Sequence, residues 1–412
     1  MRTRSPTFFF VQHLAALFAL FALLVGVIAH VDTESERNER ATAVASGLER
    51  LVTDDAPIAV PTTGPTSSTI PLDTSTTTTT RQPLSPVTFD SLDQIATIID
   101  FADFTAQGPE RWLDSVGNLT EVSLVSSADG ETQPVFWLPP SGDHDQPVVV
   151  VLHSWSAQYT QHAGIPFATW AEENGWAMIA PEFRGKNDDP AAVGSPLAVQ
   201  DVVDAIDFAV AQPGVDEERV FVVGYSGGGM MALLTAGQHP DRVTAVSAWG
   251  PPHDLENFYD FARTKNLGYA DDIERACGGD PRREAEAQEE CWSRSPSSVL
   301  DVVAAQEIPV FIGQGIRDPF VMRNAAADVF NALAHSEDRL SDEDIELLRR
   351  GRIPGESVDA VTIETHFDEK DPDPVFARAS ASVLMVYFAD EHDLVYGAAA
   401  EWFSTDPRRP AG

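Results

Sequence analysis

The sequence predicts a doubly wound α/β fold, in which helices cover both faces of a mostly parallel sheet and a small cap inserts into the chain. Residues 148–152 form a continuous run of branched apolar side chains, the pattern of a strand that is buried on both faces. After this run, helical and strand-like patterns alternate along most of the chain. Such alternation is typical of parallel strands joined by crossover helices.

The composition favours one large domain and excludes nucleic acid as a partner. The chain has 412 residues, 43% of them hydrophobic, which is enough to bury a full-sized core. Its formal net charge is -37, from 64 acidic and 27 basic residues. So acidic a surface repels a phosphate backbone and offers no basic stripe to bind one. The sequence carries no signal that fixes an oligomeric state.

Residues 1–30 predict an export segment. Arg2 and Arg4 precede an apolar stretch over residues 8–29. Two interpretations fit it: a cleaved signal peptide, with residues 27–29 as the cleavage site, or a retained helix that tethers the protein to the membrane. Because the positive residues come first, both interpretations place the rest of the chain outside the cytoplasm, either secreted or anchored.

A linker and a globular domain are predicted after the export segment. Residues 31–88 become rich in Thr, Pro and Ser and include the unbroken run 76–80, so they cannot bury enough apolar surface to fold. The pattern becomes globular from residue 89 onward, which predicts one domain over 89–412. It begins with an amphipathic stretch at 92–104 that predicts a covering helix.

The elements of the domain follow in order. Strands at 119–126 and 132–138 flank Asp129-Gly130, a dipeptide favoured in tight turns, and predict a β-hairpin. Further strands are predicted at 148–152, 177–180, 219–223, 243–248, 310–313 and 383–388. Helices are predicted at 163–173, 197–211, 228–236 and 395–403.

Two polar excursions interrupt this alternation. Residues 251–299 predict a cap over the carboxyl edge of the sheet, and residues 336–359 predict a charged helical segment. The two cysteines of the chain, Cys277 and Cys291, both lie in the cap. Because an exported protein meets oxidising conditions, we expect them to form a disulfide. Their spacing matches no zinc pattern, and we expect no metal site.

A serine occupies a sharp turn between a strand and a helix. The strand at 219–223 runs into Gly224-Tyr225-Ser226-Gly227-Gly228 and then into a helix, the local context of a nucleophile elbow. Side chains two residues before and two residues after a serine in so strained a turn would collide with neighbouring backbone, which explains the glycines. We therefore expect Ser226 to be a catalytic nucleophile.

A dinucleotide-binding fingerprint competes for the same glycines. Residues 227–232 read Gly-Gly-Gly-Met-Met-Ala and fit that fingerprint with Ala in its last position. The fingerprint requires an acidic residue near the end of the next strand, where this chain has Ala248-Trp249-Gly250. The oxidoreductase interpretation is therefore disfavoured.

A base and an acid are available on the loops after the last strands. His392 follows the final predicted strand and is the expected general base, with His366 as the alternative. Asp318 follows the preceding strand and is expected to orient the imidazole, with Asp254 as the alternative acid. The chain order Ser226, Asp318, His392 is the order of this elbow's usual partners.

Two backbone amides are expected to hold the oxyanion of a tetrahedral intermediate. One is the amide of Gly227, directly after the nucleophile, and the other is the amide of Trp155 in the loop after strand 148–152. His153 in the same loop is expected to brace the loop rather than to titrate. The aromatic residues Tyr225, Trp249 and Phe320 are the candidate walls of an apolar substrate pocket.

With these pieces in place, residues 148–403 resemble the catalytic domain of the prolyl oligopeptidase family of α/β-hydrolases, and more loosely the dienelactone-hydrolase and acetyl-xylan-esterase-like enzymes. The matching segments are His153-Ser154-Trp155, Pro181-Glu182-Phe183-Arg184-Gly185, Gly224-Tyr225-Ser226-Gly227-Gly228, Ser295-Pro296, Asp318 and Glu391-His392. The resemblance implies a serine peptidase or esterase that uses neither a metal nor an organic cofactor.

The resemblance is incomplete in two respects. Residues 89–148 are too few to form the β-propeller of the larger family members. The spacing from Asp318 to His392 is longer than the family pattern, because the charged segment at 336–359 intervenes. We therefore expect an exported serine hydrolase that acts on a peptide or small-molecule substrate, with a carboxylesterase as the alternative and a catalytically silent cell-surface binding module as the alternative of another class.

Overall fold

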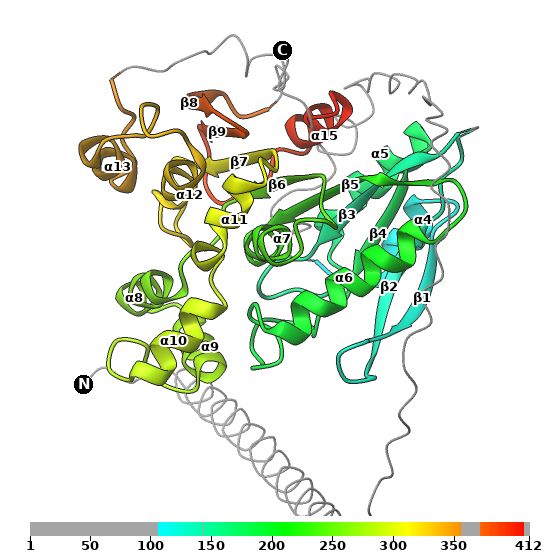
Figure 1. Cartoon of the computed structure of the whole chain (residues 1–412), viewed down its shortest axis with the longest axis horizontal. Coiled ribbons are helices and arrows are strands. Elements are labelled where there is room, and N and C mark those ends of the chain that lie inside the picture. Colours follow the sequence, from blue (N-terminus) through cyan, green and yellow to red (C-terminus); the bar gives the residue numbers. More distant parts are fainter. Residues whose placement is uncertain (1–105, 143, 356–370, 408–412) are drawn as a thin grey trace, which may run out of the picture. The chain divides into compact units, whose positions relative to one another are not determined.

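The computed structural model describes residues 106–142, 144–355 and 371–407 (Figure 1). All of these belong to the second of the two units into which the chain divides, Thr80–Gly412. The expected export segment, linker and first helix, at 1–30, 31–88 and 92–104, lie outside the described residues. Within the described ranges, no helix combines the length and the apolar content that crossing a bilayer requires.

One nine-stranded sheet organises the described part of the chain, in the order β1-β2-β4-β3-β5-β6-β7-β9-β8. Its six central strands are mutually parallel, whereas β1, β2 and β8 run antiparallel to their neighbours. This mostly parallel sheet has the topology of the α/β-hydrolase fold and confirms the predicted fold class. The strands are β1 (Thr120–Val125), β2 (Thr132–Leu138), β3 (Gln146–Leu152), β4 (Ala177–Pro181), β5 (Val215–Tyr225), β6 (Ala245–Trp249), β7 (Val310–Gly315), β8 (Pro374–Ser380) and β9 (Val383–Phe388).

Helices cover the sheet on both faces (Figure 1). One face carries α4 (Pro109–Ser115), α5 (Ile165–Asn174) and α15 (Tyr396–Ser404). The other face carries α6 (Pro196–Val210), α7 (Gly227–Gln238), α11 (Leu300–Ala305) and α12 (Ala325–Leu333). These helices match the predicted ones to within a few residues at each end, while α4, α11 and α12 are additional to the prediction.

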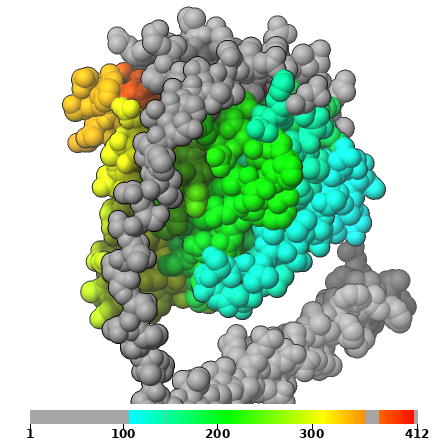
Figure 2. Space-filling model, turned by 45° about the vertical axis from the view of Figure 1, so that its right-hand side comes forward, coloured from blue at the N-terminus to red at the C-terminus, as the bar shows by residue number. Residues whose placement is uncertain are grey.

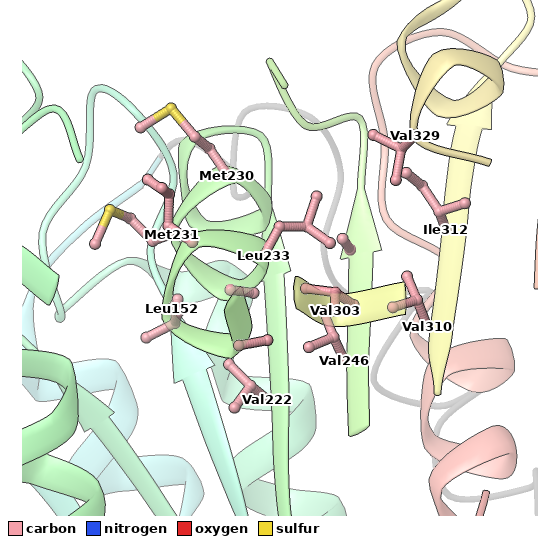
Figure 3. Packing of buried hydrophobic residues seen from close by; sticks show 14 of the residues in the cluster. Leu152, Val222, Met230, Met231, Leu233, Val246, Val303, Val310, Ile312 and Val329 are labelled. Atoms are coloured by element: carbon pink, nitrogen blue, oxygen red, sulfur yellow. The ribbon is translucent and has the colours of Figure 1, made fainter. Parts of the chain in front are cut away.

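The central strands are apolar on both sides because both faces are covered. Along β5, Val220 and Val222 belong to one buried cluster, and Phe221 and Val223 belong to the other. Figure 3 shows how Met230, Met231 and Leu233 of α7 pack over side chains from the neighbouring strands, among them Leu152, Val222 and Val246. The helix that follows Ser226 is therefore fixed against the middle of the sheet.

Arg184 ties the β1–β2 hairpin to helix α6. Its guanidinium donates from Nη1 to Asp129 Oδ2 at 2.7 Å and from Nε to Asp201 Oδ2 at 2.6 Å, and its side chain is 4% exposed. Asp129 lies in the predicted hairpin turn, and the Arg184 hydrogen bond lowers the pKa of its carboxyl to about 2. The ion pairs hold the start of the loop at 185–194, which borders the candidate site.

The predicted cap at 251–299 consists of short helices. They are α8 (Leu255–Lys265), α9 (Tyr269–Cys277), α10 (Ala285–Ser293) and the 3-10 turn η2 (Pro296–Ser298). The disulfide between Cys277 and Cys291 joins the end of α9 to α10, as expected. In the charged excursion, α13 (Asp342–Arg349) is helical as predicted, with a capping box at Ser341 and Asp344. The end of that excursion, at 356–359, lies outside the described residues.

Candidate active site

Ser226 occupies the turn that joins β5 to α7. Its backbone has φ 55° and ψ -118°, a conformation that side-chain-bearing residues rarely adopt. The Ser226 amide donates to the Trp249 carbonyl at 2.7 Å, which links the turn to the end of β6. Such strain at a strand-to-helix turn is the geometry expected of a nucleophile elbow.

The neighbouring glycines are required by close backbone contacts. A Cβ on Gly224 would lie 2.1 Å from the Gly228 carbonyl oxygen, and a Cβ on Gly228 would lie 2.2 Å from the Leu152 carbonyl oxygen. Both distances are far below any real carbon–oxygen contact. The steric reason predicted for the glycines two residues before and two after Ser226 is therefore confirmed.

His392 and Asp318 are brought together from the loops after β9 and β7. Asp318 Oδ2 accepts a hydrogen bond from His392 Nδ1 at 2.7 Å. The other carboxylate oxygen accepts from the amides of Phe320 and Val321 at 2.8 and 2.9 Å, and Asp318 is 1% exposed. Because the Nδ1–H of a neutral His392 donates to this carboxylate, its Nε2 atom is left as the acceptor.

His392 also lies beside the elbow. The Tyr225 hydroxyl donates to the His392 carbonyl at 2.6 Å, and the two rings have centroids 4.7 Å apart. A Cβ on Gly250, the residue after the Trp249 that binds the Ser226 amide, would lie 3.0 Å from His392 Cε1. Among the described residues Ser226 Oγ has no hydrogen bond, so its contact with His392 Nε2 stays a prediction. Hydrogen bonds between a nucleophile and its base commonly tighten only when substrate is bound.

The structure describes the alternative acid, Asp254, but not the alternative base, His366. The Asp254 side chain caps helix α8 by accepting from the Asn257 amide at 2.8 Å. It therefore has the turn-capping role that is usual for such an aspartate. His366 lies outside the described residues.

Two backbone amides next to Ser226 have no acceptor in the part of the chain that the structure describes. Trp155 N donates to no described residue, and Gly227 N, at the first position of α7, has no partner within its helix. A Cβ on Gly227 would lie 2.7 Å from Trp155 N, so the two amides are close together. These are the amides expected to hold an oxyanion, a role that stays a prediction.

His153 braces the loop that carries Trp155. Its ring stacks on Phe183 with centroids 3.8 Å apart, and its Nδ1–H donates to the Ser154 carbonyl at 3.1 Å. Burial lowers the pKa of His153 to about 4, so the ring is neutral at neutral pH. Gln161 completes the support, since its Oε1 accepts from the Ser154 amide at 2.9 Å.

The three residues expected to wall a substrate pocket have different surroundings. Phe320 is partly exposed and meets His392 edge to face with centroids 5.7 Å apart. Trp249 is fully buried and packs on Phe311 and Phe388, which places its ring in the core beneath the sheet. Tyr225 borders a small cavity of about 20 Å³, enough for about one water molecule.

An aromatic cluster at the cap was not predicted from the sequence. The Trp155 ring meets Phe258 of α8 at 5.5 Å and Tyr269 of α9 at 5.7 Å between centroids. Its indole Nε1 donates to Asp272 Oδ2 of α9 at 3.0 Å. Because Trp155 also carries one of the candidate oxyanion amides, the cap contacts the site through this residue. No sequence pattern links 155 to 258–272.

Asp393, next to the candidate base, makes stability depend on pH. Burial raises the pKa of its carboxyl to about 6 from an ordinary value of 3.8. The folded state therefore binds the proton more tightly than the unfolded state, and stability falls as pH rises from about 4 to 6. We expect Asp393→Asn to be more stable than wild type by about 2 kcal/mol at pH 8 and by nearly nothing at pH 4.

Urea unfolding of both proteins at pH 4, 6 and 8 measures this difference. The asparagine keeps an acceptor for the Leu394 amide, which donates to Asp393 Oδ1 at 2.7 Å, so the local turn is retained. A difference in stability that does not change with pH would contradict the assignment.

Among the described residues, no group of three or more His, Cys, Asp or Glu side chains is arranged to hold a metal ion.

Comparison with known proteins finds one matching family model and several relatives. Residues 197–348 match the model of the prolyl oligopeptidase family, Peptidase_S9, which confirms the resemblance seen in the sequence. Feruloyl esterase B of Thermothelomyces thermophilus is 26% identical over 140 residues, covering 32% of this chain and 48% of that protein. Dipeptidyl peptidase family member 6 of Caenorhabditis elegans is 26% identical over 195 residues, covering 45% of this chain and 26% of that protein.

A solved structure, the acylaminoacyl peptidase of Pyrococcus horikoshii, is similar with a TM-score of 0.42 and 14% identity, covering 55% of this chain and 37% of that chain. The alignments therefore span about half or less of the relatives' own length. The matching family model and these curated relatives are those of peptidases and esterases.

Proposed function

We propose that this protein is a serine hydrolase that cleaves peptide or ester bonds through an acyl-enzyme on Ser226, with His392 as general base and Asp318 as the group that orients it. The observation that carries the proposal is the buried His392–Asp318 hydrogen bond at 2.7 Å beside a strained serine turn. The carboxylate fixes the Nδ1–H tautomer and stabilises the imidazolium when it forms.

The chemistry consists of two acyl transfers. As Ser226 Oγ bonds to the substrate carbonyl carbon, its proton passes to His392 Nε2 and the carbonyl oxygen becomes an oxyanion facing the amides of Gly227 and Trp155. The oxyanion collapses, the bond to the amine or alcohol breaks, and His392 gives that leaving group its proton. Water then repeats the sequence on the acyl-enzyme and releases the acid and free Ser226.

The substrate class we propose first is a peptide, and the second is a carboxylic ester. The family is a peptidase family, and one relative is named a dipeptidyl peptidase. The aromatic residues near the site, Phe320 beside His392 and Trp155 with its cap neighbours, favour an apolar or aromatic acyl group. The relative named a feruloyl esterase makes an aryl ester the specific alternative.

We also propose that the protein works outside the cytoplasm. The apolar stretch at 8–29 after Arg2 and Arg4 supports export, and the disulfide of the cap suits an oxidising compartment. Fractionation of cells that express the full chain, followed by detection of the catalytic domain, measures this location.

A fluorophosphonate probe and a substrate panel test the activity. We expect the probe to label the wild type covalently and to leave Ser226→Ala unlabelled, since only the serine alkoxide displaces its leaving group. A peptide library and a set of aryl and alkyl esters then separate the two substrate classes. Cleavage of esters with no cleavage of any peptide would reverse their order, and absence of labelling in a folded wild type would favour a silent binding module instead.

A further inference from the structure

Asn187, in the loop after β4, has a side-chain nitrogen without a partner. The residue is 0% exposed, and among the described residues nothing accepts a hydrogen bond from its Nδ2 atom. The orientation of the amide is fixed, because its Oδ1 accepts from the Val193 amide at 2.6 Å and only the oxygen can do so. Buried donors without acceptors are rare and costly in proteins, and each calls for an explanation.

The orphan donor converges with the two backbone amides beside Ser226. The position that a Cβ on Gly227 would take lies 2.7 Å from Trp155 N and 2.9 Å from Asn187 Nδ2. The two nitrogens therefore lie on the same side of Gly227, near enough to each other for one oxygen outside the contact range of Gly227 Cα to accept from both. Because the Gly227 amide adjoins the same Cα, the three nitrogens surround one position for an acceptor beside Gly227.

We propose that Asn187 is a third hydrogen-bond donor of the oxyanion hole, a role that rests on the proposed acyl-enzyme function. Its Nδ2–H would be satisfied by the oxygen of the tetrahedral intermediate, together with the amides of Gly227 and Trp155. A donor that finds its acceptor only as negative charge develops stabilises the transition state more than the bound substrate.

The surroundings of Asn187 hold this donor in place before substrate arrives. Its own amide donates to the Trp155 carbonyl at 2.8 Å, which couples it to the loop carrying the second donor. Arg294, 7% exposed at the end of α10, donates to the Pro190 carbonyl at 2.8 Å and to the Ala192 carbonyl at 3.3 Å. Because the loop is held at both ends, binding of the oxyanion requires little reorganisation free energy.

Asn187→Asp is the decisive variant because it is isosteric. The carboxylate keeps an acceptor for the Val193 amide but replaces the NH₂ donor by an oxygen that repels an oxyanion. We expect kcat on an aryl ester to fall by about 100-fold or more, with KM changed less than about threefold. Binding of an aryl boronic acid, which forms a tetrahedral adduct on Ser226, should weaken by a similar factor.

Asn187→Leu serves as the matched control, because it removes the acceptor and the donor together. If Asn187 only positions Val193, the aspartate variant keeps wild-type kcat and boronate affinity while the leucine variant loses stability and activity. That result overturns the inference. If the wild type itself is neither labelled by a fluorophosphonate nor active on any ester or peptide, the proposed function fails and this role fails with it.

A measurement on the wild type covers the case in which the variants do not fold. The Asn187 side-chain amide protons should move downfield in the NMR spectrum when the boronic acid binds, because they then donate to a charged oxygen. Ser226→Ala, which cannot form the adduct, should show no such movement. Unchanged amide resonances in a wild type saturated with the boronic acid would also overturn the inference.

Discussion

His392→Gln is expected to lower kcat by about 10⁵- to 10⁶-fold, the size of effect seen when the base of such a triad is removed. Glutamine can still donate to Asp318 Oδ2, which now accepts from His392 Nδ1 at 2.7 Å, so the buried carboxylate keeps a partner. It has no nitrogen that can take a proton from Ser226. Steady-state hydrolysis of an aryl ester and the rate of fluorophosphonate labelling measure the loss.

His366→Gln is the control for this prediction, because His366 was the alternative base in the sequence. It should retain wild-type kcat. Asp318→Asn should fall between the two, with a loss of about 10⁴-fold, because the amide group favours the wrong tautomer of the imidazole. If the losses at 366 and 392 were exchanged, the pairing of His392 with Asp318 would be structural and His366 would be the base.

Gly228→Ala is expected to destabilise the fold by more than about 3 kcal/mol, the upper range for overpacking in a well-packed site. The added methyl group would lie 2.2 Å from the Leu152 carbonyl oxygen and 2.7 Å from that of His153. Both are backbone atoms at the end of β3, so no side-chain rotation relieves the clash. Relief requires α7 to move away from the sheet that it covers in Figure 3.

Urea unfolding and soluble yield measure this effect, with Gly268→Ala as the control. A Cβ on Gly268, before helix α9, meets nothing within 4 Å, and its φ of -62° suits any residue. The control should therefore unfold at nearly the wild-type urea concentration. Equal stability of the two variants would show that the elbow tolerates a side chain at position 228.

The sheet could be predicted because its signals are local. The run of valines in β3, the hairpin dipeptide Asp129-Gly130 and the glycines around Ser226 each reflect a contact within the same element or its immediate neighbour. Strand β8 was missed, since it is an edge strand that begins with Pro374 and shows a mixed burial pattern. Antiparallel pairing with β9 stabilises β8 as a strand, although its own sequence does not indicate one.

The site could be predicted only in its covalent chemistry. Ser226, Asp318 and His392 stand out because few residue types can act as nucleophile, acid and base at the ends of strands. Asn187 does not stand out, because the role proposed for it comes from its closeness to Gly227 and Trp155, which exists only after folding. Trp249 shows the converse: its place at a strand end predicts a pocket wall, while the sequence does not show that its ring is fully buried.

In the space-filling view, the residues near the start of the described chain, drawn in cyan, lie beside the green region that includes α6 (Figure 2). Ser126, at the end of β1, donates to Asp201 of α6 at 2.5 Å. This contact and the Arg184 ion pairs join the hairpin to the helix that precedes the strand of Ser226. The hairpin therefore belongs to the catalytic scaffold.

The indole of Trp155 restricts how the cap can diverge. A cap that changes to accommodate a different substrate must still offer an acceptor where Asp272 now stands. The reason is that Trp155, whose indole donates to Asp272, also carries the backbone amide proposed for the oxyanion hole. Swapping caps between related enzymes would thus carry a hidden requirement at one position on α9. Libraries that randomise the cap should hold residue 272 to Asp or Glu while the exposed positions of that helix vary.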